Sequence, residues 1–232
     1  MFLKKFIKNY HNIRLSNKRI EVHRLKKAKA YAYIKRLIMD GKWDLEESIN
    51  VNEITEHLQM SRTPIHKAFS QLAQEGFLKI IPQVGVFVRK PKKSEVMERI
   101  LVCSNLDTLL TEQAVPKISE ETIDYLEELL KKMDIPELTT EEYSTLNIEF
   151  HSVIYAASEL TYTLELTKQI WDYLQYIGNP DILFSKEKRE RSQREHWMIY
   201  QSIKDRDRHL AKVLMEKHVR RISESVEESF SN

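Results

Sequence analysis

The sequence contains few of the residues that break helices or form covalent cross-links. Its 232 residues include 4 glycines, 6 prolines and 1 cysteine. A single cysteine excludes an intramolecular disulfide framework and fits a reducing cytosol. No apolar run approaches the roughly 20 residues of a membrane helix, and the N-terminus is too basic and too interrupted for a signal-peptide core. We therefore expect a mostly helical, cytoplasmic protein with no membrane as a partner.

Positive and negative charges are separated along the chain, although the net charge is only +2. Residues 1–39 contain twelve Lys or Arg and one Glu, whereas residues 93–232 contain 18 Lys or Arg and 27 Asp or Glu. A basic region attracts nucleic acid through phosphate contacts and the release of counterions. We expect DNA at the N-terminal part of the chain and not at the acidic C-terminal part.

Residues 59–78 contain the clearest helix signal of the N-terminal part. Ser61 is a suitable N-cap whose hydroxyl can accept from first-turn amides, Pro64 is tolerated in the first turn, and Gly76 provides the stop. One face is apolar, with Ile65, Ala68, Phe69 and Leu72. The opposite face carries Arg62, Thr63, His66, Lys67, Ser70 and Gln74. An ordinary surface helix would show this pattern, and so would a DNA-recognition helix, whose contacts begin at its N-terminus.

The segments on either side favour DNA recognition. Before this helix, the segment 50–60 is short and amphipathic, with Ile54 and Leu58 four residues apart. After it come two β-branched runs, residues 78–81 and 86–88, separated by the turn signal PQVG. The order helix, turn, helix and hairpin is that of a winged helix-turn-helix.

Specific motifs in this region are similar to those of a known family. They are MSRTPIHKA at residues 60–68, Leu72, EGFL at 75–78 and GVFV at 85–88. In this order and spacing they resemble the DNA-binding domain of the GntR family of bacterial transcription regulators. The resemblance implies operator DNA as a partner, with contacts from Ser61, Arg62, Thr63, His66, Lys67 and Gly85. Two positions depart from the pattern, because His66 and Asn52 stand where family members carry arginines.

A charged segment that contains a proline and lacks apolar periodicity, Arg89 to Ser94, marks a domain boundary. We expect four parts: a basic N-terminal extension at residues 1–19, a winged helix-turn-helix domain at 20–90, a linker at 91–94, and a helical effector-binding and dimerisation domain at 95–232. The extension lies outside the resemblance. It could be an amphipathic helix that packs on another domain, reaches along DNA or lies on an anionic membrane, or it could be a frayed basic tail.

The C-terminal part shows helical periodicity without strand signals. Six helical stretches are expected, at residues 96–115, 119–133, 139–157, 161–176, 185–204 and 206–230. Helices joined by short turns predict a bundle. The expected fold class is therefore mainly α, with an N-terminal winged helix-turn-helix followed by an all-helical bundle of about six helices.

Three of these stretches each point an imidazole toward the bundle interior, and the histidines are His151, His196 and His218. Asn147 lies four residues before His151 and therefore on the same helix face. Burying three unpartnered imidazoles is costly, and a shared cation would remove that cost. Spacing alone nevertheless favours a hydrogen-bonded network without metal, because the histidines are far apart in the sequence.

A second resemblance involves the same residues. Its motifs are NIEFH at 147–151, Glu195-His196 followed by Ile199 and Ile203, and Asp207 followed by Ala211, Met215 and His218. They are similar to motifs of the FCD effector domain found in FadR-type GntR regulators. The resemblance implies a small carboxylate effector and a divalent metal such as zinc or nickel, held by Asn147, His151, His196 and His218.

Two positions depart from the FCD pattern. Asn147 stands in place of an aspartate, so the site would be more positive, bind metal less tightly and attract a carboxylate more strongly. Asp107 stands where we place an arginine that usually anchors the effector.

The sequence thus predicts a homodimeric, ligand-responsive transcription regulator, for which repression is the commoner mode in the family. Two recognition helices would enter successive major grooves of an operator, and the bundle would report a metal or a small acid. One alternative is a regulator whose bundle only dimerises and holds its histidines in a metal-free network. Another is a metal-dependent hydrolase or lyase, which would need an open coordination position and a general base. An enzyme would leave the winged domain unexplained, so we do not expect one.

Overall fold

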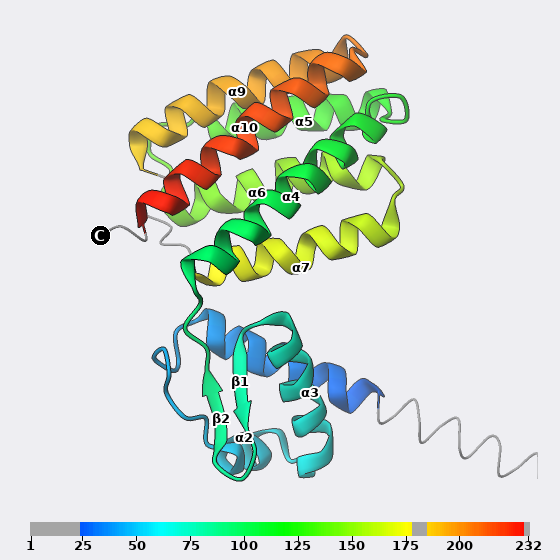
Figure 1. Ribbon diagram of the computed structural model, residues 1–232. Helices are drawn as coiled ribbons and strands as arrows, with labels where there is room; N and C mark the ends of the chain where they lie inside the picture. Colours follow the sequence, from blue (N-terminus) through cyan, green and yellow to red (C-terminus); the bar gives the residue numbers. More distant parts are fainter. Residues whose placement is uncertain (1–23, 178–184, 230–232) are drawn as a thin grey trace, which may run out of the picture. The chain divides into compact units, whose positions relative to one another are not determined.

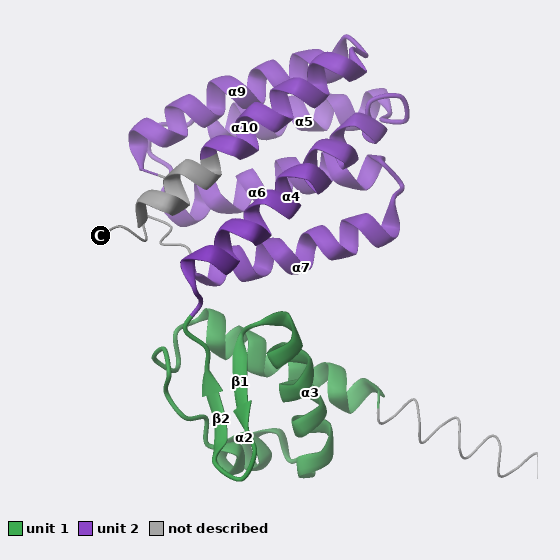
Figure 2. Ribbon diagram, in the orientation of Figure 1, with its two compact units in different colours: residues 1–90 green, residues 91–232 purple. Residues whose placement is uncertain are grey.

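The computed structural model describes residues 24–177 and 185–229, with side chains up to Arg221. The chain divides into two compact units, residues 1–90 and 91–232 (Figure 2). The predicted N-terminal extension, residues 1–19, lies outside the described residues. Among the helices that the structure describes, each is too short or too polar to cross a membrane.

The first unit combines helices with a hairpin (Figure 1). A helix over residues 24–39 is followed by α2 (Val51–Leu58), α3 (Arg62–Glu75), β1 (Leu78–Ile81) and β2 (Gly85–Val88). The two strands are antiparallel, and Leu78 pairs with Val88. A bridge between Ser48 and Phe87 attaches the segment before α2 to the hairpin. This is the predicted winged helix-turn-helix, with the hairpin as its wing.

The apolar face of α3 anchors this helix in the core of the first unit. All four predicted apolar residues are inaccessible to solvent, namely Ile65, Ala68, Phe69 and Leu72. Gly76 ends α3 in the left-handed conformation at φ 96°, which glycine adopts without strain. Ser61 is the N-cap residue, as predicted, but the predicted hydrogen bond from a first-turn amide to its hydroxyl is absent. Because Ser61 is exposed, water can satisfy the first-turn amides in its place.

The second unit is a helical bundle. Its described helices are α4 (Lys93–Ala114), α5 (Glu120–Met133), α6 (Thr140–Ala157), α7 (Thr161–Ile177), α9 (Lys186–Lys204) and α10 (Arg208–Ser229). Each of the six predicted stretches corresponds to one of these helices. The expected fold class, a winged helix-turn-helix followed by an all-helical bundle, is confirmed.

Side-chain caps determine where two of the bundle helices begin. Ser119 accepts from the N–H of Thr122 at the start of α5, and Thr139 forms a reciprocal capping box with Glu142 at the start of α6. Helix α10 packs against α4 and α9, and α5 packs against α6 and α9 (Figure 1). The space between these helices is filled by a core that includes Leu126, Leu130, Phe150, Ile199 and Met215. The three predicted histidines project into this interior.

Candidate functional site

The predicted DNA contacts lie on the solvent side of α3 and at the wing. Five of them are exposed: Ser61, Arg62, Thr63, His66 and Lys67. Gly85 is half-buried and begins β2. The first turn of α3 therefore presents a hydroxyl, a guanidinium and exposed amides at one helix N-terminus, which is the part of a recognition helix that meets bases and phosphates.

Asn52 on α2 contacts the recognition helix directly. The Nη2 of Arg62 donates to the Oδ1 of Asn52 at 2.9 Å. Both side chains are exposed, so the contact restricts the guanidinium at the surface and not in the core. In the sequence, Asn52 is notable only because it stands where family members carry an arginine. The hydrogen bond connects two residues that are ten positions apart and lie on different helices. Helical periodicity does not predict such a pair.

The structure brings the three predicted histidines together. His151 comes from α6, His196 from α9 and His218 from α10, and each has one ring nitrogen within 4.8 Å of the other two. All three are buried, and His196 is fully inaccessible to solvent. Their rings are 4.6 to 5.2 Å apart between centroids. Three helices that are distant in the sequence therefore build one cluster of imidazoles.

Each imidazole has an orienting partner at its Nδ1. The Nδ1 of His218 lies 2.8 Å from Oε2 of Glu195, and that of His196 lies 3.4 Å from Oε1 of Gln193. The Nδ1 of His151 lies 3.3 Å from the Tyr155 hydroxyl. Such outer partners fix the tautomer of metal-binding histidines and raise their basicity as ligands.

The Nε2 atoms of two of these imidazoles consequently face each other inside the bundle. Those of His196 and His218 are 3.2 Å apart, and that of His151 has no hydrogen-bond partner among the described residues. Carboxylate and amide oxygens accept from Nδ1–H of His218 and His196, which leaves a lone pair on each Nε2. Two lone pairs at this distance repel, and a cation between them would remove the repulsion.

Burial keeps these imidazoles neutral. It lowers the pKa of His151 and of His196 well below the usual range, with a contribution from the neighbouring histidines, and it lowers the pKa of His218 to about 4. Glu195, beside His218, also pairs with Arg191 at 3.6 Å and with Arg221. Its charge is therefore compensated without a proton on His218. Neutral imidazoles are the form that binds metals.

Asn147 lies one turn before His151 on α6 and is buried. Both residues line a cavity of about 80 Å³, together with Tyr155, Thr167 and other residues of α6 and α7. The Thr167 hydroxyl is buried and, like Nε2 of His151, has no partner in the described chain. The cluster therefore opens onto a small space with unsatisfied polar atoms, as expected where a small ligand binds.

Asp107 of α4 is fully buried and hydrogen-bonds to two residues that line this cavity. Burial raises the pKa of its carboxyl to about 7, although hydrogen bonds from Trp171 (3.3 Å), Tyr155 and Cys103 favour the charged form. The Tyr155 hydroxyl thus contacts both Asp107 and His151. Sequence reasoning missed Thr167 and Trp171, because α7 carries no motif that connects it with the histidines.

Comparisons with known proteins identify the family of each unit. The family model of the FCD domain matches residues 100–221, and that of the bacterial regulatory proteins of the gntR family matches residues 26–88. The HTH-type transcriptional repressor RspR of Escherichia coli is 25% identical over 188 residues, which cover 77% of this chain and 78% of that protein. The gluconate operon transcriptional repressor of Bacillus subtilis is 27% identical over 183 residues, which cover 75% of this chain and 73% of that protein.

Solved structures give the same fold. E. coli McbR/YncC matches with a TM-score of 0.69 and 20% identity, over 89% of this chain and 99% of that one. The matching domains and the named relatives are those of transcription regulators and not of enzymes.

Proposed function

Since the chain belongs to the GntR family of bacterial regulators and carries an FCD domain, we propose that it is a repressor controlled by a divalent metal and a small carboxylate in that domain. DNA-binding transcription regulation comes with the family, and operator DNA is the partner of its helix-turn-helix. Repression is supported by relatives that are themselves named repressors. The metal and the effector are supported by the histidine cluster and by the cavity beside it.

The main support for the metal is the distance between two histidine Nε2 atoms. Two nitrogens bound to the same tetrahedral zinc at about 2.0–2.1 Å are about 3.3 Å apart, and the Nε2 atoms of His196 and His218 are 3.2 Å apart. His151 would supply the third nitrogen and Asn147 a carbonyl oxygen. Imidazole ligands suit zinc and nickel. The bound ion would supply positive charge to which a carboxylate can bind.

The residues around the cavity support a small acid as the effector. A cavity of about 80 Å³ holds only a few non-hydrogen atoms. Among the residues that line it, Lys168 is the one cation. Asp107 lies where an arginine would otherwise anchor the acid, so the metal itself would be the main anchor. A neutral Asn147 leaves more positive charge on that metal than an aspartate would.

A second copy of the chain is part of the proposal, because two recognition helices are needed to read both halves of a palindromic operator. Three apolar side chains on α4 are exposed and lie on one side of this helix, at Leu101, Val102 and Leu109. Burial of such a row against its symmetry mate would stabilise a dimer.

Operator binding tests this function. Fluorescence anisotropy on DNA from the promoter regions beside the gene should give an affinity that changes about tenfold or more, or about 1.4 kcal/mol, between zinc-loaded and chelator-treated protein. Acetate or lactate should partly reverse the effect of zinc. The His151→Ala/His196→Ala variant should bind the same DNA but ignore zinc. Equal operator affinity with zinc, with chelator and with zinc plus acid would refute metal-dependent sensing.

A further inference from the structure

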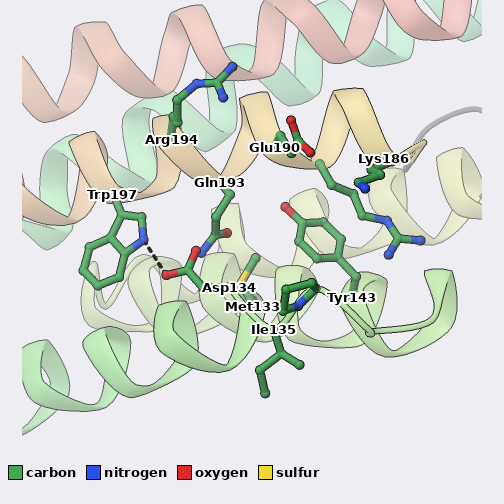
Figure 3. A pocket seen from close by; sticks show the side chains of 11 residues that line it. Met133, Asp134, Ile135, Tyr143, Lys186, Glu190, Gln193, Arg194 and Trp197 are labelled. Atoms are coloured by element: carbon green, nitrogen blue, oxygen red, sulfur yellow. Dashed lines mark hydrogen bonds between the residues drawn. The ribbon is translucent and has the colours of Figure 1, made fainter.

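A larger hollow lies between the end of α5 and α9, apart from the cavity beside His151 (Figure 3). Its volume is about 370 Å³, compared with about 80 Å³ for the cavity beside His151, and the two share no lining residue. Ligand pockets usually measure about 300–1,000 Å³. The hollow is therefore large enough for a molecule with a ring system, which the smaller cavity is not.

Aromatic and aliphatic side chains form its walls. Nε1 of Trp197 donates to Oδ2 of Asp134 at 3.0 Å, which holds the indole against the end of α5 (Figure 3). The Tyr143 ring has the Arg189 guanidinium 5.3 Å from its centre. Met133, Ile135 and Pro136 complete the apolar lining. A planar apolar group would find ring and alkyl contacts here.

The charges around the hollow favour a monoanion. The lining residues include the cations Lys186, Arg189 and Arg194 and the acids Asp134 and Glu190. In Figure 3 the Arg194 guanidinium turns away from Gln193 and Trp197. Lys186 forms no ion pair with the residues that the structure describes. The Arg189 guanidinium already donates to the Leu138 carbonyl and to the Thr140 hydroxyl. The end near Lys186 is therefore the place for a carboxylate, opposite the Trp197 indole.

Gln193 links the hollow to the histidine cluster. Its side chain lines the hollow between Trp197 and Tyr143 in the view of Figure 3, yet it is only 7% exposed. Nε2 of Gln193 donates to the Leu130 carbonyl at 2.9 Å, and its Oε1 lies 3.4 Å from Nδ1 of His196. A ligand oxygen that competes for Nε2 would move the amide away from His196 and remove the acceptor that orients the imidazole.

We propose that this hollow is a second ligand site, for an aromatic monocarboxylic acid, and that its occupant weakens metal binding by the histidines through Gln193. The proposal of a ligand site depends only on the cavity and on the charges that line it. The linkage rests on the proposed metal.

Naphthalene-2-carboxylate is a suitable probe for the site, with naphthalene-2-carboxamide as its neutral counterpart. Isothermal titration of the full chain should show one saturable site that prefers the carboxylate by about tenfold, as expected for a hydrogen bond to a charged group. Ile135→Trp, at a half-exposed position, should block the hollow, and Lys186→Gln should remove most of the preference for the carboxylate.

Matched variants separate the hollow from the rest of the bundle. Lys204→Gln removes a cation at the other end of α9, and Thr167→Val alters only the cavity beside His151, so both should bind the probe normally. Absence of saturable binding, equal affinity for acid and amide, or normal binding by Ile135→Trp would overturn the site.

Zinc titration against a competing chelator tests the linkage. Saturating naphthalene-2-carboxylate should lower zinc affinity by about tenfold, the lower end of the effect of losing an outer-shell partner, and zinc should weaken probe binding by the same factor. Equal zinc affinity with and without the probe would overturn the linkage. A chain that binds the probe but no zinc would contradict both the linkage and the proposed metal, while the site would stand.

Discussion

The Nε2 atoms of His196 and His218 lie 3.2 Å apart in the interior of the helical unit, although the two residues belong to different helices. Each ring is turned toward the other by an acceptor at its Nδ1, Gln193 for His196 and Glu195 for His218. Without a cation or a proton between them this arrangement is repulsive, and burial opposes the proton. The same two contacts therefore favour a metal and explain why a glutamine and a glutamate lie next to the cluster.

Replacing Asn147 by aspartate should strengthen metal binding. A carboxylate in place of a neutral carbonyl adds a negative ligand to a dipositive ion, and we expect about tenfold tighter zinc binding or more, or at least about 1.4 kcal/mol. A competing chelator measures the change. Asn105→Asp, an exposed position on α4, is the matched control. Unchanged zinc affinity in Asn147→Asp would show that residue 147 is not a ligand.

Arg62→Ala should weaken operator binding and relax base preference, because one bidentate base contact contributes about 1–3 kcal/mol of discrimination. Asn52→Ala should have a smaller effect in the same direction, since Asn52 restricts the Arg62 guanidinium. The double variant should then be no weaker than Arg62→Ala alone. Gln74→Ala, exposed at the far end of α3, serves as the control in the anisotropy assay. Additive effects would mean that Asn52 acts independently of Arg62.

Asp107→Asn should stabilise the protein at neutral and alkaline pH but not at pH 4. Burial raises the pKa of Asp107 from 3.8 to about 7, so the folded state holds this proton more tightly than the unfolded state does. Its contribution to stability is complete below pH 4 and is lost as pH rises through about 7. Thermal unfolding should give similar Tm values for both proteins at pH 4 and a higher Tm for the variant at pH 8.5. Asp124→Asn, the same substitution at an exposed position of α5, is the matched control. A Tm difference independent of pH would contradict a protonated Asp107.

Deletion of residues 1–19 should make operator binding less sensitive to salt. This segment contains six Lys or Arg and no acid. Each phosphate contact that is lost lowers the slope of log affinity against log salt by about 0.9. Anisotropy titrations from low to moderate salt measure that slope. An unchanged slope would assign all phosphate contacts to the winged domain.

Helix positions could be predicted from the sequence because their signals are local. Ser119 and Thr139 cap their helices at the starts of two predicted helical stretches, and Gly76 ends α3 as expected. The apolar spacing of Ile65 and Leu72 correctly gave the buried face of the recognition helix. Ser61 shows the limit of such rules, since it has the right residue type at the right place but makes no capping hydrogen bond.

The contacts of the candidate sites depend on packing between distant helices, which periodicity does not determine. Spacing placed His151, His196 and His218 on apolar faces but gave no distance between them. The resemblance to FCD domains grouped them, and the structure gives their separation. Thr167 and the Arg62–Asn52 hydrogen bond were not anticipated, because each depends on which helices become neighbours.

Metal content tests the central claim most directly. Elemental analysis of the full chain, purified without chelator at neutral pH, should find close to one equivalent of zinc or nickel per chain. His209→Ala, which removes an exposed histidine of α10, should retain the metal, and His151→Ala/His196→Ala should lose it. Less than a tenth of an equivalent in the unaltered chain, together with no rise in Tm on addition of zinc, would contradict a metal centre at the three histidines.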